Sequence, residues 1–153
     1  MKAERGGVGP MATPAEIVAE ARRWLGTPYV HQASCAGAGA DCLGLVRGVW
    51  RACAGPEPET VPAYTWDWSE TDGVERLLAA AARHFEPVGE AAPGDVLIFR
   101  MRAGGVAKHM GILSAATPPA FIHSYTRAGV VEAALSDAWA RRIAGIFRFR
   151  NGE

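Results

Sequence analysis

The chain has 153 residues, of which 49% are hydrophobic and 21% are charged, with 16 basic residues against 16 acidic ones. This composition is typical of one ordinary soluble domain that can bury a core. A net charge of zero lacks the basic surplus of a nucleic-acid binder. No stretch reaches the roughly 18 mainly apolar residues that a membrane-spanning helix needs. We therefore expect no nucleic-acid partner and no membrane span.

The sequence divides into a short beginning and one domain. Residues 1–12 are expected to form a flexible leader, and residues 13–153 a single domain. The first ten residues are charged and glycine-rich and lack the apolar core of a secretory signal, so we expect synthesis in the cytoplasm without an export signal. The three cysteines occur at spacings that match no zinc pattern, so reduced thiols are expected.

Apolar residues recur at helical spacing in the first half of the domain. Helices are predicted over residues 14–25, 42–54 and 69–85. Thr13 and Glu16 match a capping box at the start of the first helix. Asp41 is the candidate N-cap of the second. Gly44 and Gly48 weaken that second helix, which is tolerable if another backbone packs close to them.

From Pro93 onward the pattern changes from helical to alternating. Strands are predicted over residues 96–100, 108–114, 120–126, 130–133 and 143–150. A helical turn over 136–141 carries Trp139, which is expected in the core. Helices followed by an antiparallel sheet of about five strands make this an α+β pattern.

One cysteine stands where a helix begins. Cys42 is the first residue of the predicted second helix. Unpaired backbone N–H groups and the positive end of the helix dipole favour a thiolate there. The N–H of Cys42 can also point at an oxyanion formed on an attacked carbonyl. The alternative is a small buried apolar residue, and the position in the helix alone leaves both readings open.

Two histidines lie on neighbouring predicted strands. His109 and His123 are equally far from Ala116, so a hairpin turning there places the imidazoles opposite each other on one face, with Cβ atoms about 4.5–5.5 Å apart. A helix laying its amino end across this face brings Cys42 to His109, giving a nucleophile, a base and an orienting group. A metal site is a weaker alternative because zinc normally takes three or four protein ligands.

Five short motifs occur in order between about residues 14 and 150: Gly26-Thr27-Pro28-Tyr29, Asp41-Cys42-Leu43-Gly44-Leu45-Val46, Pro93-Gly94-Asp95-Val96, His109-Met110-Gly111-Ile112 and Phe121-Ile122-His123. Together they resemble the NlpC-type family of bacterial cell-wall cysteine peptidases. The resemblance implies a compact papain-like α+β domain in which Cys42 is the nucleophile, His109 the base and His123 the group that orients it. Tyr29 matches a family tyrosine whose hydroxyl can touch the reacting carbonyl. Asp41 is expected first to cap the helix and second to belong, with Tyr29, to the residues that contact the substrate and its oxyanion.

The same resemblance implies hydrolysis of an amide bond in peptidoglycan stem peptides, between γ-D-glutamate and the diamino acid, without a cofactor or a metal. Leu43 departs from the family pattern, because many members have serine directly after the cysteine. The family's usual recognition of the substrate end uses that serine hydroxyl, which Leu43 lacks. With segments 48–50 and 64–68, Leu43 is similar to the subset found in phage-tail and gene-transfer-particle modules. That subset implies action at the cell envelope, in the periplasm, from a particle or after lysis.

Two other functions remain open on the same residues. An acyltransferase uses the same site and passes the acyl group to an amine or lipid instead of water. A structural tail component binds cell wall without cutting it, although a pure binder has no need of a thiol at a helix start. His31 is expected as a polar loop residue, with substrate contact as the alternative because it lies close to Tyr29.

Overall fold

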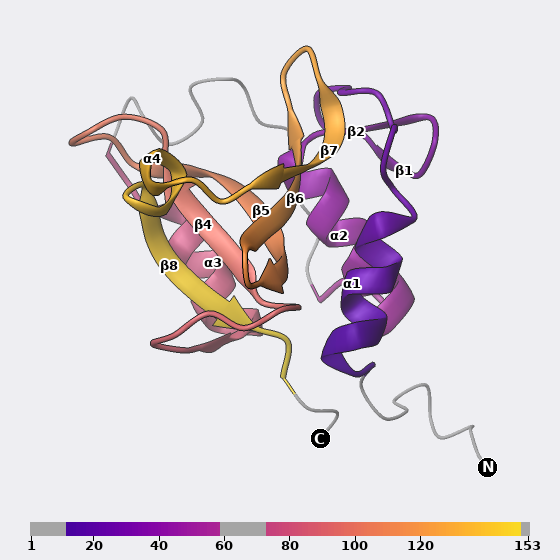
Figure 1. Cartoon of the computed structure of the whole chain (residues 1–153), viewed down its shortest axis with the longest axis horizontal. Coiled ribbons are helices and arrows are strands. Elements are labelled where there is room, and N and C mark those ends of the chain that lie inside the picture. Colours follow the sequence, from indigo (N-terminus) through magenta and orange to yellow (C-terminus); the bar gives the residue numbers. More distant parts are fainter. Residues whose placement is uncertain (1–11, 59–72, 151–153) are drawn as a thin grey trace.

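The computed structural model describes residues 12–58 and 73–150, and the predicted leader up to residue 11 lies outside these ranges (Figure 1). The helices are α1 (Pro14–Arg22), α2 (Cys42–Cys53), α3 (Arg76–His84) and α4 (Asp137–Ala140). The strands are β1 (Ser34–Cys35), β2 (Gly39–Ala40), β3 (Glu86–Pro87), β4 (Val96–Arg100), β5 (Ala107–Ala116), β6 (Pro119–Tyr125), β7 (Gly129–Ala134) and β8 (Ile143–Arg148). No helix in the described ranges is both long enough and apolar enough to span a membrane.

Helices α1 and α2 begin at the N-caps that the sequence predicts, Thr13 and Asp41. In α1 the hydroxyl of Thr13 accepts from the Glu16 N–H at 3.1 Å, and the Glu16 carboxylate accepts from the Thr13 N–H at 2.8 Å. This capping box satisfies two of the backbone donors that a helix start leaves unpaired. The predicted end of α1 is wrong by three residues, because the chain tightens into a turn after Arg22. Trp24 is nevertheless buried from that turn.

The third predicted helix starts too early. Residues 69–72 lie outside the described ranges. In the described range that starts at residue 73, α3 begins only at Arg76. Gly73 has φ +70°, a left-handed conformation that does not continue a helix. The carboxylate of Glu75, the residue before α3, accepts from Arg100 and from the backbone N–H of Ala107. The start of α3 is therefore tied to β4 and β5.

The main sheet is antiparallel with the strand order β3-β8-β4-β5-β6-β7. The prediction of about five strands misses β3, which has two residues and pairs with β8 at one edge. The β1–β2 hairpin was missed for the same reason, because two residues are too short to show an alternating pattern. The expected order of helices before an antiparallel sheet, and with it the α+β class, is confirmed.

The sheet buries both faces. On one face Ile98, Met110 and Ile112 join a core with residues of α1, α2 and α3. On the other face Leu97 and Phe99 form a smaller core that α4 covers. In Figure 1, α3 lies behind β4 and β8 while α4 lies in front of them. The chemistry-bearing strands β5 and β6 therefore run through the middle of a two-sided core.

The two glycines of α2 allow close packing, as expected. A Cβ on Gly44 would lie 1.8 Å from the carbonyl oxygen of Ala33. A Cβ on Gly48 would lie 1.9 Å from the indole of Trp24, so the close neighbour there is a side chain rather than a backbone. Real Cβ atoms essentially never come so near to other atoms. The glycines therefore let the amino end of α2 lie directly against the loop before β1.

Candidate active site

Asp41 fixes the start of α2 and the loop beside it. One carboxylate oxygen accepts from the Gly44 N–H at 2.8 Å, which is the predicted N-cap bond. The other accepts from the Gln32 N–H at 2.7 Å and lies 3.8 Å from Nδ1 of His31. The residue is only 2% exposed. Asp41 therefore joins the helix that carries Cys42 to the loop that follows Tyr29.

The sulfur of Cys42 lies against the strand that carries His109. Cys42 is the first residue of α2 and is half-buried. Its Sγ lies 3.9 Å from the carbonyl oxygen of Lys108 and accepts a hydrogen bond from the N–H of Met110. These two backbone groups stand on either side of His109 in β5. The structure thus brings the thiol to the β5 segment that bears the first of the two histidines.

The two imidazoles are hydrogen-bonded to each other. Nε2 of His109 lies 2.8 Å from Nδ1 of His123, and the ring centroids are 5.0 Å apart. Both residues are buried, with exposed fractions of 7% and 3%. Because Nε2 of His109 is occupied by His123, Nδ1 is the ring nitrogen left to exchange a proton with another group.

The prediction that these histidines stand directly opposite each other is wrong, although they share a face. Strand β5 pairs with β6 as Ile112 with Ile122, and a bulge follows Leu113, so the turn is not centred on Ala116. Continuing this register sets His123 opposite Gly111, where an added Cβ would lie 3.0 Å from the Cβ of His123. The imidazoles are therefore diagonal neighbours, and aromatic side chains reach across that separation.

The protonation states differ from the sequence expectation. Burial, and then the negative charge of Asp41, raise the pKa of the Cys42 thiol to about 12, whereas the helix start by itself is expected to favour a thiolate. Burial and the neighbouring His123 lower the pKa of His109 to about 3, and burial lowers that of His123 to about 4. At neutral pH the thiol and the two imidazoles are therefore all neutral.

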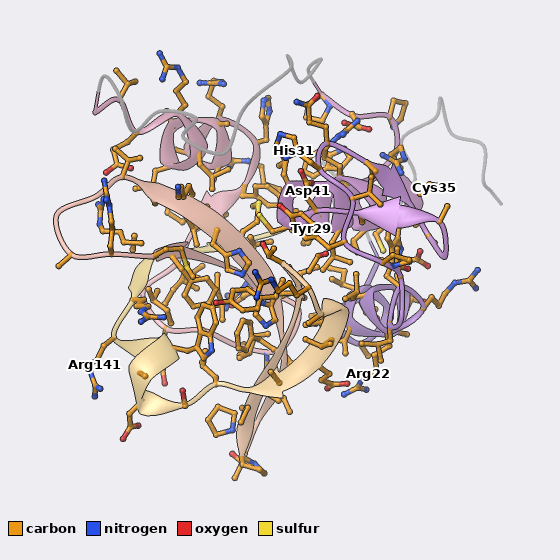
Figure 2. All side chains as sticks on the ribbon, turned by 90° about the horizontal axis from the view of Figure 1, so that it is seen from above. Arg22, Tyr29, His31, Cys35, Asp41 and Arg141 are labelled. Atoms are coloured by element: carbon orange, nitrogen blue, oxygen red, sulfur yellow. The ribbon has the colours of Figure 1, made fainter. Side chains whose placement is uncertain are left out.

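Tyr29 also lies at this site. Burial, followed by the nearby Cys42 and Asp41 charges, raises the pKa of Tyr29 to about 12, and its side chain hydrogen-bonds with Thr126. In Figure 2, Tyr29, His31 and Asp41 lie side by side near the amino end of α2. The phenol is therefore protonated at neutral pH and able to donate a hydrogen bond.

Other predicted positions lie apart from this group. Cys35 is on the outer hairpin in Figure 2 and is exposed, whereas Cys53 is half-buried and packs against the main core. All three cysteines are free of disulfides. Asp95 caps its turn through the Ala92 N–H and pairs with Arg148 at 2.8 Å. In the described ranges, no three His, Cys, Asp or Glu residues gather as metal ligands.

One neighbour of the histidines was not anticipated. Trp139 was expected simply in the core, but its ring lies 5.6 Å from that of His109 and 5.1 Å from that of His123. It comes from α4, a helix of four residues. A single tryptophan in so short a helical turn has no periodic pattern around it, so no sequence signal links it to the histidines.

A family model described as "NlpC/P60 family" matches residues 26–148. The chain belongs to the NlpC/P60 family. Gamma-DL-glutamyl hydrolase of Bacillus subtilis (strain 168) is 28% identical over 150 residues, which cover 97% of this chain and 32% of that protein. The family resemblance is thereby confirmed, and this NlpC/P60 chain spans only part of its curated relative's length.

Solved structures agree on the fold. An NlpC/P60 family protein from Bacillus cereus ATCC 10987 superposes with a TM-score of 0.67 at 19% identity, over 95% of this chain and 43% of that one. The NlpC/p60 domain of the peptidoglycan hydrolase SagA superposes with a TM-score of 0.61 at 23% identity, over 90% of this chain and all of that one. The expected helices on an antiparallel sheet are therefore the NlpC/P60 fold.

Proposed function

We propose that this NlpC/P60 chain is a cysteine peptidase that hydrolyses an amide bond in peptidoglycan stem peptides. The observation that carries the proposal is the 2.8 Å contact between the buried imidazoles of His109 and His123, with His109 on the strand whose backbone borders the sulfur of Cys42. A thiol, a base and a group that orients the base are what nucleophilic acyl transfer needs. Two relatives named as a gamma-DL-glutamyl hydrolase and a peptidoglycan hydrolase support the substrate class.

In the proposed first step, Sγ of Cys42 attacks the carbonyl carbon while Nδ1 of His109 takes the thiol proton. Because the thiol and the imidazole both start neutral, proton transfer accompanies the attack. The S–C bond forms, the C–N bond breaks, and His109 passes its proton to the leaving amine. His123 holds His109 through Nε2 during both transfers. The result is a thioester on Cys42 and a free amine.

Two donors are proposed for the oxyanion that forms in this step. The N–H of Cys42 lies in the first turn of α2, where backbone donors have no intrahelical partner. The hydroxyl of Tyr29 is the second donor, since its raised pKa keeps it protonated. Both carboxylate oxygens of Asp41 accept backbone N–H groups, so Asp41 is assigned to supporting the helix start and the loop.

Water completes the reaction by attacking the thioester carbonyl, with His109 now accepting a proton from the water. Cys42 leaves as the thiol, and the product is a carboxylic acid. We assign the scissile bond to the one between γ-D-glutamate and the diamino acid. This finer assignment is supported by the family resemblance of the sequence motifs and by the printed activity of the relative from Bacillus subtilis.

Digestion of purified peptidoglycan tests the proposal. Wild type, Cys42→Ala and the control variant Cys53→Ala are incubated with the polymer, and soluble fragments are identified by mass spectrometry. We expect fragments with a new amino group on the diamino acid from wild type and Cys53→Ala, and none from Cys42→Ala. Identical fragments from wild type and Cys42→Ala contradict the proposal. If an added amine is found joined to the product in place of water, the site catalyses acyl transfer. If the protein sediments with polymer that stays uncut, the chain is a cell-wall binder.

The place of action is proposed separately. We propose that the protein meets its substrate at the cell envelope and that a phage-tail-like particle carries it there. Similarity at Leu43 and at residues 48–50 supports carriage, while the third similar segment, 64–68, lies outside the described residues. Immunoblotting of purified particles from the source cells tests this proposal, and a signal that never sediments with particles contradicts it.

A further inference from the structure

Six rings gather on the face of the sheet that α4 covers, and we call them the aromatic cluster. Five stand on the sheet strands, and they are Phe99 of β4, His109 of β5, and Phe121, His123 and Tyr125 of β6. The sixth, Trp139, comes from α4 and lies across the other five. Its ring centroid is 5.1 Å from that of Phe99, 5.6 Å from His109, 5.3 Å from Phe121, 5.1 Å from His123 and 5.8 Å from Tyr125.

We propose that Trp139 is a positioning residue for the histidine pair. It holds the imidazoles of His109 and His123 in their hydrogen-bonded pose and keeps water away from them. The catalytic consequence of this role rests on the proposed peptidase function. The physical effect on the two imidazoles does not, because it is present in the free protein.

The ring geometry explains how one indole restrains two imidazoles. The terminal torsion of a histidine side chain has a broad energy profile, so packing must select the ring orientation. The ring of His109 packs against those of Phe99 and Trp139, at 5.8 Å and 5.6 Å and with interplanar angles of 38° and 34°. His123 lies at 32° to Phe121, and Trp139 meets it edge-on at 81°. Rotation of either imidazole therefore runs into the indole.

Trp139 is itself held from both ends of α4. Its backbone N–H donates to the hydroxyl of Ser136 at 3.3 Å, which caps the helix. The guanidinium of Arg142 lies 5.6 Å from the indole centroid, a cation–π distance. The carbonyl oxygen of Arg142 accepts from the N–H of Arg100 at 2.8 Å, which ties the end of α4 to β4. The indole is thus fixed to the sheet rather than carried on a free loop.

Charged and titratable groups stand on several elements around the histidine pair. Helix α2 carries the thiol of Cys42, β6 carries the phenol of Tyr125 with its ring 5.9 Å from that of His109, and the end of α4 carries the guanidinium of Arg142, which lies over Trp139. On β4, Arg100 is engaged by Glu75. Burial is the leading cause that lowers the pKa of both histidines. Uncovering the pair therefore changes its titration mainly through hydration.

Histidine titration by NMR tests the proposal without any substrate. Wild type, Trp139→Ala, Trp139→Phe and Trp50→Ala are labelled at histidine and titrated from pH 8 to the acid unfolding limit. Trp50 is a matched control, because it is also half-buried and its ring lies 5.3 Å from Phe85 in the other core. In Trp139→Ala we expect the pKa of His109 or His123 to rise by about one unit or more. In Trp139→Phe and Trp50→Ala, His109 and His123 should titrate as in wild type, and His84, whose ring lies 6.4 Å from Trp50, is left out of the comparison.

The same variants separate positioning from plain stabilisation in catalysis. With peptidoglycan as substrate, Trp139→Ala should lower kcat and move the acid limb of its pH profile upward, and Trp139→Phe should restore both. Histidine titrations of folded Trp139→Ala that match wild type would overturn the proposal. If Trp139→Ala does not fold, Trp139→Leu replaces it with the same expectation and the same overturning result. If wild type shows no hydrolysis, the peptidase function fails while the titrations still decide the role of Trp139.

Discussion

Replacing His123 by a residue of similar size, with or without a polar end, isolates its hydrogen bond to His109. In His123→Asn the side-chain amide occupies nearly the place of Nδ1 and can still bond Nε2 of His109. In His123→Leu the volume is similar but no polar atom remains. We therefore expect His123→Asn to keep more activity than His123→Leu, because only the latter leaves Nε2 of His109 buried without a partner.

The size of the effect follows from the burial of the pair. A buried polar atom that loses its partner costs about 1–3 kcal/mol. Since about 1.4 kcal/mol corresponds to a tenfold rate, His123→Leu should have a kcat about 5- to 150-fold below that of His123→Asn. The free energy of unfolding should differ between the two variants in the same direction and by a similar amount. Both differences arise from the single 2.8 Å contact.

Release of the new amino group from soluble peptidoglycan fragments measures kcat, and urea denaturation at pH 7 measures stability. Both variants must show the circular dichroism spectrum of wild type, so that a lost fold is not mistaken for a lost base. Equal kcat values for His123→Asn and His123→Leu would refute the reasoning, because they would mean that the bond between the imidazoles does not orient His109.

Three further predictions concern stability and are measured by urea denaturation. The folded-state pKa of His123 lies near 4, against 6.5 for an ordinary histidine, so the unfolded chain binds a proton first as the pH falls. The free energy of unfolding should therefore drop by about 3 kcal/mol between pH 6.5 and 4 from this residue alone. A free energy of unfolding that stays constant over this pH range contradicts the buried neutral pair. Asp41→Ala should lower the unfolding free energy by about 2 kcal/mol through loss of the N-cap, and an unchanged value refutes the capping role. Gly44→Ala should cost about 3 kcal/mol because its Cβ meets the carbonyl oxygen of Ala33, whereas Gly89→Ala, which has open space, should be nearly neutral; similar losses in both contradict the close approach.

Sequence reasoning predicts the local features of this fold well. A helix cap involves residues that are close together in the sequence, so the sequence identifies it directly. Thr13 and Asp41 accordingly cap their helices where expected. The alternating period of two sets the face of each strand residue, so His109 and His123 fall on one face even though the predicted register is wrong. An error in the position of the turn does not change which residues of one strand share a face. It does change which residue of the neighbouring strand lies directly opposite each of them.

Features that depend on distant packing were beyond the sequence. The thiol of Cys42 stands at a helix start as predicted, yet burial and Asp41 raise its pKa, and neither burial nor the exact neighbours can be read from the helix position. Trp139 lies on the histidines because α4 folds back over β5 and β6, a contact that spans many residues of chain. Two-residue strands such as β3 carry too little pattern to be recognised.

The covalent intermediate offers the most direct test of the proposed nucleophile. Wild type mixed with a soluble stem-peptide fragment is quenched in acid within the first turnover, digested, and the mass of each cysteine-containing peptide is measured. We predict an acyl adduct on the peptide that carries Cys42, with the same adduct in a Cys35→Ser variant and a smaller amount in His109→Ala. Turnover that proceeds with an adduct on Cys35, or with Cys42 replaced by alanine, would contradict it.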